Sequence, residues 1–521
     1  MPAVKDTPET TADRPIASVR LELLVAVIFS IFYFCDILLR ASEKFFWYDE
    51  LVTVYFARLP DFHTLWAALG NGIDFNPPSF YLLTRASNLL FGEGTIATRL
   101  PEIVGFWIFA LCLYRFVNRR AGVLAGSIAM LLPMVTGAYF YASEARPHAV
   151  VLGFCGLALV FWQMASESAP YRHGALAGFA AALFGAFLMH CYAILLVTPF
   201  ALVELVRSLR SKRIEWRAWI ALAVPIALAL PVYGALLRSF RKLQTATTFA
   251  QVALPGWSQA GHFYMALLEP CLIVFLAALV LFALDLSKSD SMLSGAAIRR
   301  DIGLAVAFLF LPAWGVVLGK VVHGPFFNRY FLSAVAGITI VIGAGAAWRG
   351  RHSWTARALL GILVAALLLS FSRLAIARLE GRGEPLKEPS SGLMLDTTPG
   401  QPLAMHPLLA SDRSALPVAV IHPFEYLYLA HYAPAVRSRL YYVAASADDY
   451  DYAAFPRFFH CCARISNDPV LLSQFVREHQ EYLVYGFAHD PSRIAALAAP
   501  GSCVESIVFR GEHFLAKMIR R

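Results

Sequence analysis

Two adjacent carboxylates, Asp49 and Glu50, follow the first long apolar run of the chain. Because adjacent carboxylates repel each other and bind water strongly, they suit proton transfer or metal binding at the mouth of a membrane-embedded cavity. The structural alternative is a helix start, where acids in the first turn stabilise the helix dipole. That alternative explains one acid better than a pair that follows Trp47 and Tyr48. We therefore interpret Asp49 and Glu50 as candidate catalytic residues.

Two other segments could place charge beside this pair. Glu144 and Arg146 lie in a short polar turn between apolar runs, and charge at the edge of the hydrocarbon is costly unless it is paired or hydrated. Arg329, followed by Tyr330, has a planar side chain that suits bidentate hydrogen bonding to phosphate. The structural alternatives are an interfacial ion pair for Glu144 and Arg146, and an arginine that only reaches the membrane surface for Arg329.

Three polar residues are weaker candidates for binding a substrate. His190 and Tyr192 lie at the junction of two apolar runs, where a single histidine is more often a packing residue. Asn76 precedes two prolines, a segment that either shapes a cavity wall or only breaks a helix. Together with the charged residues, these positions offer a general base and a cationic clamp for an anion. Transfer from a lipid-phosphate donor requires both.

Apolar runs make up most of the chain, which is 58% hydrophobic and only 15% charged. Soluble proteins usually carry about 25% charged residues. Runs long enough to cross a bilayer predict about eleven transmembrane helices. We expect them near residues 21–39, 98–117, 122–141, 148–165, 174–189, 190–206, 217–236, 266–286, 302–320, 330–347 and 357–374.

Basic residues set the predicted orientation. Arg119 and Arg120 lie between the second and third runs, and further Lys and Arg residues lie between runs six and seven, eight and nine, and ten and eleven. The positive-inside rule makes that side cytoplasmic, so the candidate residues lie on the opposite, extracytoplasmic face of an inner or plasma membrane. The formal net charge of +9 follows from these loops. No basic stripe with interleaved aromatic residues indicates nucleic-acid binding.

The chain divides into four parts. Residues 1–20 form a cytoplasmic tail without the features of a cleaved signal peptide, and residues 21–375 form the transmembrane domain. Loop 40–97 of that domain has helix-like apolar spacing, which predicts one or two amphipathic helices along the membrane surface, followed by an apolar helix over 79–91. Residues 376–405 form a linker, and residues 406–521 form an extracytoplasmic domain.

The last part is expected to be a small α/β domain with a largely parallel sheet. Helices are expected over 423–431 and 469–479. Strands are expected over 418–421, 440–443, 482–485 and 506–509. Cys503 could form a disulfide with Cys461 or Cys462 in an oxidising compartment, or join them and His460 in a metal site that matches no standard zinc spacing.

Five motifs in the transmembrane part of the chain resemble those of the GT-C superfamily of integral-membrane glycosyltransferases. The resemblance covers residues 20–375 and depends on the order of five motifs in matching topological places. Its nearest branch includes protein O-mannosyltransferases, the lipid A aminoarabinose transferase and lipopolysaccharide-core transferases. The motifs are Trp47-Tyr48-Asp49-Glu50, Asn76-Pro77-Pro78 with Tyr81, Glu144-Ala145-Arg146-Pro147, His190-Cys191-Tyr192 and Asn328-Arg329-Tyr330.

The resemblance implies inverting transfer of a sugar from a polyprenyl-phosphate donor to an envelope acceptor. Asp49 would be the base and Glu50 would orient it. Glu144 would be a second acid near the donor or a divalent cation, for which Asp49 and Glu144 are candidate ligands. Arg146 and Arg329 would hold the departing phosphate. Two alternatives remain from other classes: a transporter or lipid flippase, and a membrane-anchored binding protein that acts through residues 400–521.

Overall fold

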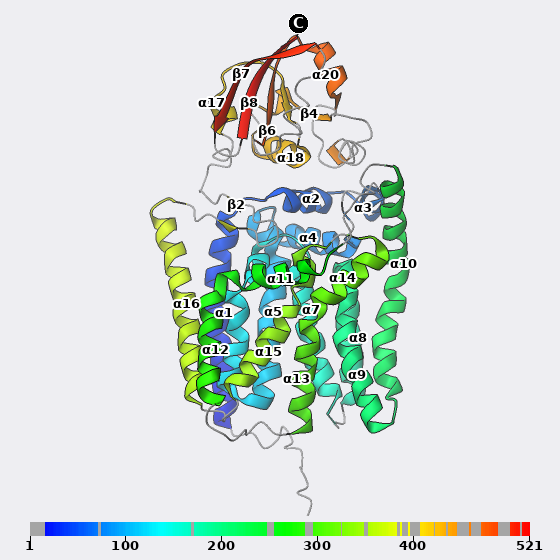
Figure 1. Ribbon diagram of the computed structural model, residues 1–521, viewed down its shortest axis with the longest axis vertical. Coiled ribbons are helices and arrows are strands. Elements are labelled where there is room, and N and C mark those ends of the chain that lie inside the picture. Colours follow the sequence, from blue (N-terminus) through cyan, green and yellow to red (C-terminus); the bar gives the residue numbers. More distant parts are fainter. Residues whose placement is uncertain are drawn as a thin grey trace, which may run out of the picture.

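The computed structural model defines a tall helical bundle with a small sheet domain at one end (Figure 1). We call this the capped end, and the other the opposite end. The described residues are 16–70, 74, 76–167, 171–246, 255–286, 295–324, 326–347, 353–382, 386–387, 394–395, 407–420, 422–433, 436–444, 458–459, 470–487, 501–510 and 513–520.

Each of the eleven predicted apolar runs is helical. The long helices of the bundle are α1 (Ile16–Glu43), α5 (Thr95–Ala121), α7 (His148–Ala165), α8 (Arg172–Met189), α9 (Val197–Ser211), α10 (Trp216–Ala246), α12 (Leu272–Leu286), α13 (Ala296–Leu309), α15 (Ala334–Ala346) and α16 (Trp354–Leu379). Shorter helices complete it: α6 (Val123–Leu131), η2 (Leu132–Val135), η3 (Gly137–Ser143), η4 (Cys191–Leu196), α11 (Ser258–Leu268), η6 (Glu269–Cys271), α14 (Leu311–Val322) and η7 (Asn328–Phe331).

The number of helices that can cross a membrane is lower than eleven. Among the described residues, eight pass by length and composition, and up to ten if each of two bent pairs is one span. The bends are 74° between α6–η2 and η3, and 45° between α13 and α14. The tenth run, 330–347, corresponds to α15, whose 13 residues reach only about 20 Å of the roughly 30 Å hydrocarbon core.

Glycine allows α5 and α7 to cross with their backbones in contact. A Cβ atom on Gly105 would lie 2.6 Å from the carbonyl oxygen of Ala149, and one on Gly153 would lie 2.7 Å from that of Gly105. Both distances are too short for any larger residue. This crossing fixes the start of α7, and the turn before it, against α5.

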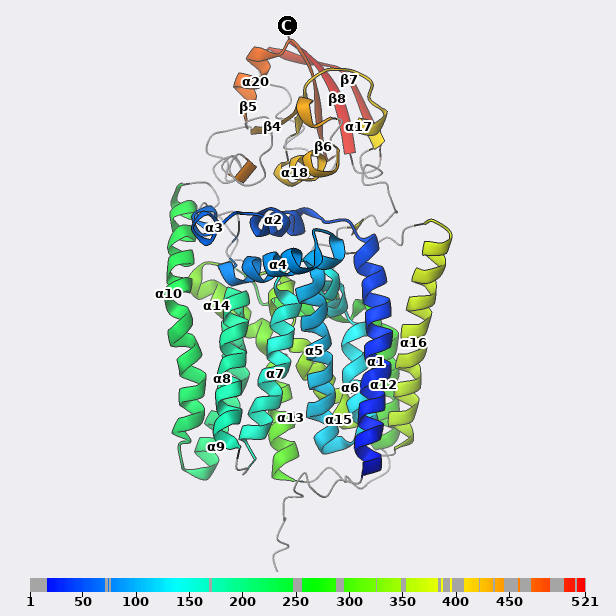
Figure 2. The same cartoon turned by 180° about the vertical axis from the view of Figure 1, so that it is seen from behind.

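Three short helices form a layer at the capped end: α2 (Tyr48–Ala57), α3 (Phe62–Leu69) and α4 (Pro78–Phe91). Helices α2 and α4 lie across the end of the bundle (Figure 2). The apolar helix expected over 79–91 is α4. The expectation of one or two amphipathic helices along the membrane surface stays a prediction, although residues 50–57 of α2 are all buried. Phe56 contacts Tyr81 of α4 on one side and Phe458 of the C-terminal domain on the other.

The C-terminal domain contains a mixed sheet of order β5-β4-β3-β6-β8-β7. Pairs β3–β4, β3–β6 and β4–β5 are parallel, whereas β6–β8 and β7–β8 are antiparallel. The four predicted strands are present; β5 and β8 were not predicted. The bounds are β3 (Val418–Val420), β4 (Leu440–Ala444), β5 (Val470–Leu471), β6 (Glu481–Phe487), β7 (Ser502–Arg510) and β8 (His513–Arg520).

Helix α18 (Pro423–Tyr432) is the first predicted helix of this domain, and it faces the bundle (Figure 1). Helix α20 (Leu472–Glu478) is a shorter form of the second predicted helix. The remaining elements are η9 (Arg437–Arg439), α17 (Pro407–Ser411) and the hairpin of β1 (Leu386–Lys387) and β2 (Met394–Leu395). The proposed cysteine pairing and metal site involve residues 460–462, which lie outside the described residues.

Candidate active site

Asp49 forms an ion pair with Arg329 at the capped end. Oδ2 of Asp49, in the first turn of α2, lies 2.9 Å from Nη2 of Arg329 in η7, and the two side chains are 17% and 13% exposed. Burial tends to lower the pKa of Arg329, but the charge of Asp49 offsets this and raises it. The guanidinium is therefore permanently charged. A carboxylate and a cation from segments 280 residues apart thus meet at a position that solvent can reach.

Arg146 forms a second pair beside the first. Its Nη1 lies 2.5 Å from Oδ2 of Asp74 and donates to the backbone carbonyl of Asp49 at 3.4 Å. Asp74 also accepts a hydrogen bond from Nδ2 of Asn76 at 2.9 Å. Burial tends to raise the pKa of Asp74, yet Arg146 holds it below the usual range. Asn76 therefore contributes to the site by orienting Asp74.

Both arginines keep an unused donor. Within the part of the chain that the structure describes, Nε of Arg146 and Nε of Arg329 are buried without a hydrogen-bond acceptor. Leaving a buried charged donor unsatisfied is costly. The two guanidinium groups can therefore each donate a further hydrogen bond, for example to an anion.

Aromatic rings form one side of this cluster. The ring of Tyr330 lies 4.6 Å from the rings of both His190 and Tyr192, and His148 lies 5.4 Å from His190. Burial and the charge of Arg146 lower the pKa of His190 to about 3, so its ring is neutral at physiological pH. Burial raises the pKa of Tyr330 to about 12. We call this uncharged surface the aromatic wall.

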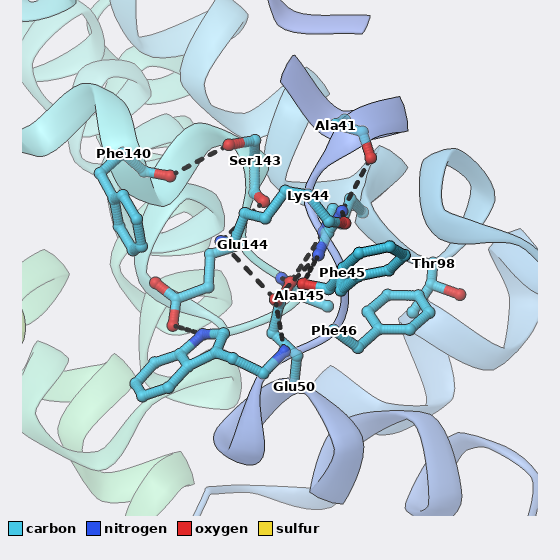
Figure 3. Close-up of polar contacts among 12 residues, drawn as sticks. Ala41, Lys44, Phe45, Phe46, Glu50, Thr98, Phe140, Ser143, Glu144 and Ala145 are labelled. Carbon is cyan, nitrogen blue, oxygen red and sulfur yellow. Dashed lines mark hydrogen bonds and ion pairs between the residues drawn. The ribbon is translucent and has the colours of Figure 1, made fainter. Parts of the chain in front are cut away.

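The side chain of Asp49 pairs with Arg329, whereas that of Glu50 has other partners, and the catalytic role of Glu50 stays a prediction. The Glu50 carboxylate is fully buried, 2.7 Å from Nε of Arg99 and 3.6 Å from Nζ of Lys44, and accepts from the Ala145 amide at 2.7 Å (Figure 3). The physical reason for the different partners is helix geometry, since successive residues do not share a face. Burial tends to raise the pKa of Glu50, but Arg99 and Lys44 lower it. Glu50 thus joins α2 to α5 and to the turn before α7.

Glu144 is also turned inward. Its buried side chain accepts a hydrogen bond from Nε1 of Trp47 at 3.0 Å, so it fixes the residue at the N-terminus of α2. The ion pair considered between Glu144 and Arg146 is replaced by the pair of Arg146 with Asp74. Glu144 therefore orients the segment that carries Asp49.

The candidate metal ligands do not assemble in the structure. No group of three or more His, Cys, Asp or Glu side chains that could hold a metal ion occurs among the described residues. Asp49 faces Arg329 and Glu144 faces Trp47. This donor set does not fit a divalent cation, and we assign no step to one.

Sequence reasoning missed Asp74, Arg99 and Lys44. Asp74 had a usable signal, because it is an acid two residues before Asn76 in a loop already identified as functional. Arg99 and Lys44 had none, because an arginine and a lysine near the ends of apolar runs are ordinary in membrane proteins. Only their contacts with Glu50 show what they do.

The chain resembles known proteins in part of its sequence and throughout its fold. Residues 76–234 match the family described as dolichyl-phosphate-mannose-protein mannosyltransferase. No curated protein matches the sequence. The crystal structure of ArnT from Cupriavidus metallidurans in the apo state is similar, with a TM-score of 0.56 and 14% identity over 96% of this chain and 98% of that one.

ArnT from the same organism bound to undecaprenyl phosphate gives a TM-score of 0.51 at 14% identity, over 97% of this chain and 98% of that one. The similarity extends over the bundle and the C-terminal domain. It confirms the resemblance to the GT-C superfamily at the level of the fold.

Proposed function

We propose that this chain, which has the GT-C fold, is a membrane glycosyltransferase. In this proposal it moves a sugar from a polyprenyl-phosphate donor to an envelope acceptor, which is a glycolipid, a polysaccharide or a protein. The observation that carries the proposal is the direct pairing of Asp49 with Arg329, beside an Arg146 that keeps an unused donor. A base next to a cationic clamp is what attack on a sugar phosphate requires.

In the proposed reaction, the Asp49 carboxylate takes the proton of an acceptor hydroxyl. The acceptor oxygen then attacks the anomeric carbon while the bond from that carbon to the phosphate oxygen breaks. The products are the glycosylated acceptor, with inverted configuration, and the polyprenyl phosphate. The proton remains on Asp49 until it passes to solvent, which the partly exposed side chain can reach.

The two arginines stabilise the leaving group. A phosphate gains negative charge as it departs, and Arg329 and Arg146 can each donate to it from Nε and an Nη atom. The donor phosphate competes with Asp49 for Arg329, which frees the carboxylate to accept the proton. Asp74 remains on Arg146 and keeps it oriented. Because phosphate is a good leaving group, no general acid is needed.

The aromatic wall binds the donor without adding charge. His190, Tyr192 and Tyr330 offer apolar ring faces with polar tips beside the arginines. Because His190 is neutral at physiological pH, it does not compete with the arginines for the phosphate. These rings provide the contact surface for the sugar or for the first part of the lipid.

The proposed face of the membrane is extracytoplasmic. The site lies at the capped end with the C-terminal domain, whereas Arg119, Arg120 and Arg300 gather at the opposite end, where α5 and α7 end and α13 begins. The positive-inside rule makes the opposite end cytoplasmic. In this proposal the chain is a multi-pass protein of the inner or plasma membrane.

The comparisons support a lipid-linked donor. The matched family is described by an activity that uses dolichyl-phosphate-mannose, and one similar structure is that of a protein bound to undecaprenyl phosphate. Both lipids carry a phosphate on a long polyprenyl chain. Comparing the envelope molecules of strains with and without the chain identifies the sugar and the acceptor.

Mass spectrometry of envelope molecules tests the proposal. A strain without the chain is compared with strains that express the wild type or Asp49→Asn at equal membrane levels. We expect one class of glycolipid, polysaccharide or glycoprotein to lose a sugar in the deletion strain and to regain it only with the wild type. If no sugar changes, and proteoliposomes with the wild type instead show flux of a solute or lipid, the chain is a transporter.

A further inference from the structure

The C-terminal domain contacts the segment on both sides of Asp49. Helix α18 lies directly over α2 (Figure 2). His431 and Tyr432 lie three and four residues after Tyr428, so each is a neighbour of Tyr428 on the helix surface. All three contact residues 45–55 of the bundle.

The contact before Asp49 fixes the backbone. The hydroxyl oxygen of Tyr432 accepts a hydrogen bond from the Phe46 amide at 2.8 Å, and the rings of Tyr432 and Phe45 meet edge to face at 5.5 Å. Tyr48, directly before Asp49, contacts the ring of Tyr428 at 6.3 Å. The turn that enters α2 is therefore held by side chains from a segment almost 400 residues away.

The contact after Asp49 fixes the far end of the same helix. The hydroxyl group of Tyr55 lies 2.9 Å from Nδ1 of His431, and the two rings meet edge to face at 5.6 Å. Burial, with the nearby charges of Arg58 and Arg437, lowers the pKa of His431 to about 4. The ring is neutral at physiological pH, and its Nδ1 can accept a hydrogen bond from the Tyr55 hydroxyl group.

The inner side of α2 has separate anchors. Glu50 is tied to Arg99 and Ala145, and Glu144 is tied to Trp47. These contacts restrain the helix from below, and Arg99 also reaches the Phe45–Phe46 turn, donating to the Phe45 carbonyl at 3.1 Å with its guanidinium group 4.8 Å from the centre of the Phe46 ring. Helix α18 holds the same turn from the other side, through the Phe46 amide. Because a misplacement of about 1 Å can cost roughly 100-fold in rate, the two anchors together set where the carboxylate lies.

We propose that α18 of the C-terminal domain positions the base, with Tyr432 and His431 as positioning residues that act through the Phe46 amide and the Tyr55 hydroxyl. This inference rests on the proposed function. It gives the domain a role in the chemical step itself, distinct from recognition of the acceptor. It predicts that loosening α18 lowers the rate of transfer while the arginines still bind phosphate.

The test compares two conservative variants on one helix. Tyr432→Phe removes only the hydroxyl group that accepts from the Phe46 amide. Tyr426→Phe is the matched control, because Tyr426 faces the interior of its own domain, with its ring 4.9 Å from Phe459 and 6.0 Å from Tyr442. Both variants are made in the full chain and purified in lipid nanodiscs.

Three measurements are made on each protein. Hydrogen exchange reports how well the amides of residues 45–57 are held. Titration with undecaprenyl phosphate measures phosphate binding by Arg146 and Arg329. Restoration of the envelope sugar in the deletion strain, at equal protein levels, measures transfer. For Tyr432→Phe we expect faster exchange and transfer reduced about three- to tenfold, the size of one lost hydrogen bond, with lipid-phosphate affinity within about twofold of the wild type. Tyr426→Phe should match the wild type in all three.

A double-variant cycle provides a second test of the inference. Tyr55→Phe and His431→Phe each remove one side of the same hydrogen bond, so the double variant should transfer no more slowly than the slower single variant. Unchanged transfer in Tyr432→Phe despite faster exchange overturns the inference, as does equal loss in Tyr426→Phe. If the wild type restores no sugar, the proposed function fails instead, and the exchange data separate that outcome from a failure of α18 to hold the segment.

Discussion

Two partly buried clusters of paired charge lie at opposite ends of the helical bundle. At the opposite end, Arg119 and Arg120 both pair with Glu167, and Asp301 accepts from Nε of Arg120 and from Gln163. At the capped end, Arg329 pairs with Asp49 and Arg146 with Asp74. The residue types are the same, but the completeness of the hydrogen bonding differs.

In the cluster of Arg119 and Arg120, both guanidinium Nε atoms have acceptors. Nε of Arg119 donates to Glu167 and Nε of Arg120 to Asp301, which ties the ends of α5 and α7 to the start of α13. At the capped end, the Nε atoms of Arg146 and Arg329 have no acceptor in the described structure. In the first cluster the fold itself satisfies the Nε atoms, whereas in the second these atoms can still donate to an anion, which is the role proposed for them.

Neutralising one acid in each cluster should separate the two roles most strongly. Asp49→Asn removes the base, so transfer should fall by about 100-fold or more while the protein still inserts and folds. Asp301→Asn should instead lower stability by about 3 kcal/mol, because buried cations lose a partner, with transfer per folded molecule retained. Envelope mass spectrometry and thermal unfolding measure the two effects, and full activity in Asp49→Asn would exclude Asp49 as the base.

Removing one arginine from each cluster should sharpen the same contrast. Arg329→Ala should weaken the binding of undecaprenyl phosphate by about 10- to 100-fold, since a charge-assisted hydrogen bond to phosphate is worth roughly 1.5–3 kcal/mol. Arg120→Ala should leave that affinity unchanged. Titration in nanodiscs measures it, with undecaprenol as the control lipid that lacks phosphate. Donor and acceptor use that fall equally in Arg329→Ala would contradict a phosphate clamp.

Glu50→Gln tests whether the second acid of the pair belongs with the structural cluster. It leaves Arg99 and Lys44 without their carboxylate, so the free energy of unfolding should fall by about 3 kcal/mol. The pKa of Glu50 is lowered in the folded state, so its contribution is present above the unfolded value of about 4.3. That contribution is lost as pH falls through the folded pKa.

Thermal unfolding between pH 3 and pH 7 measures this contribution. The wild type should lose stability with acid more steeply than Glu50→Gln, and parallel curves would argue against a buried ionised Glu50. Glu50→Gln should also retain transfer in the fraction that remains folded. A folded but inactive variant would show that Glu50 takes part in the transfer reaction.

His190 should produce the smallest effect. Its pKa of about 3 lies far below the unfolded value of about 6.5, so the ring is neutral throughout the working range. Wild type and His190→Gln should therefore show activity–pH profiles of the same shape between pH 5 and pH 8, with rates within a few-fold of each other. An inflection near pH 6.5 that disappears in His190→Gln would show that the imidazole titrates in the site.

The sequence predicted the elements better than the directions of their side chains. All eleven apolar runs became helices, because hydrophobic length is a local property. Strand β8 was missed although burial alternates along it: Phe514, Ala516 and Met518 are buried, whereas Leu515 and Lys517 are partly exposed. The sequence does not alternate in the same way, because Leu515 and Ile519 on the other face are also apolar.

Asp49 and Glu50 show most directly where sequence reasoning stopped. Their types and their place after the first run indicated chemistry, and the motifs at 146, 190 and 329 do gather around Asp49. Which of two adjacent acids faces them depends on the rotation of α2 about its axis. That rotation is set by Arg99, Ala145 and α18, all distant in sequence.

The sequence by itself determined a polytopic helical protein with polar motifs at one end, because the length and polarity of each run are encoded locally. Only the tertiary structure decided that Asp74 pairs with Arg146, that Glu50 is a buried anchor and that the C-terminal domain contacts the segment on both sides of Asp49. Those facts depend on contacts between segments about 50 to almost 400 residues apart. Such contacts leave no periodic or local trace in the residues that make them.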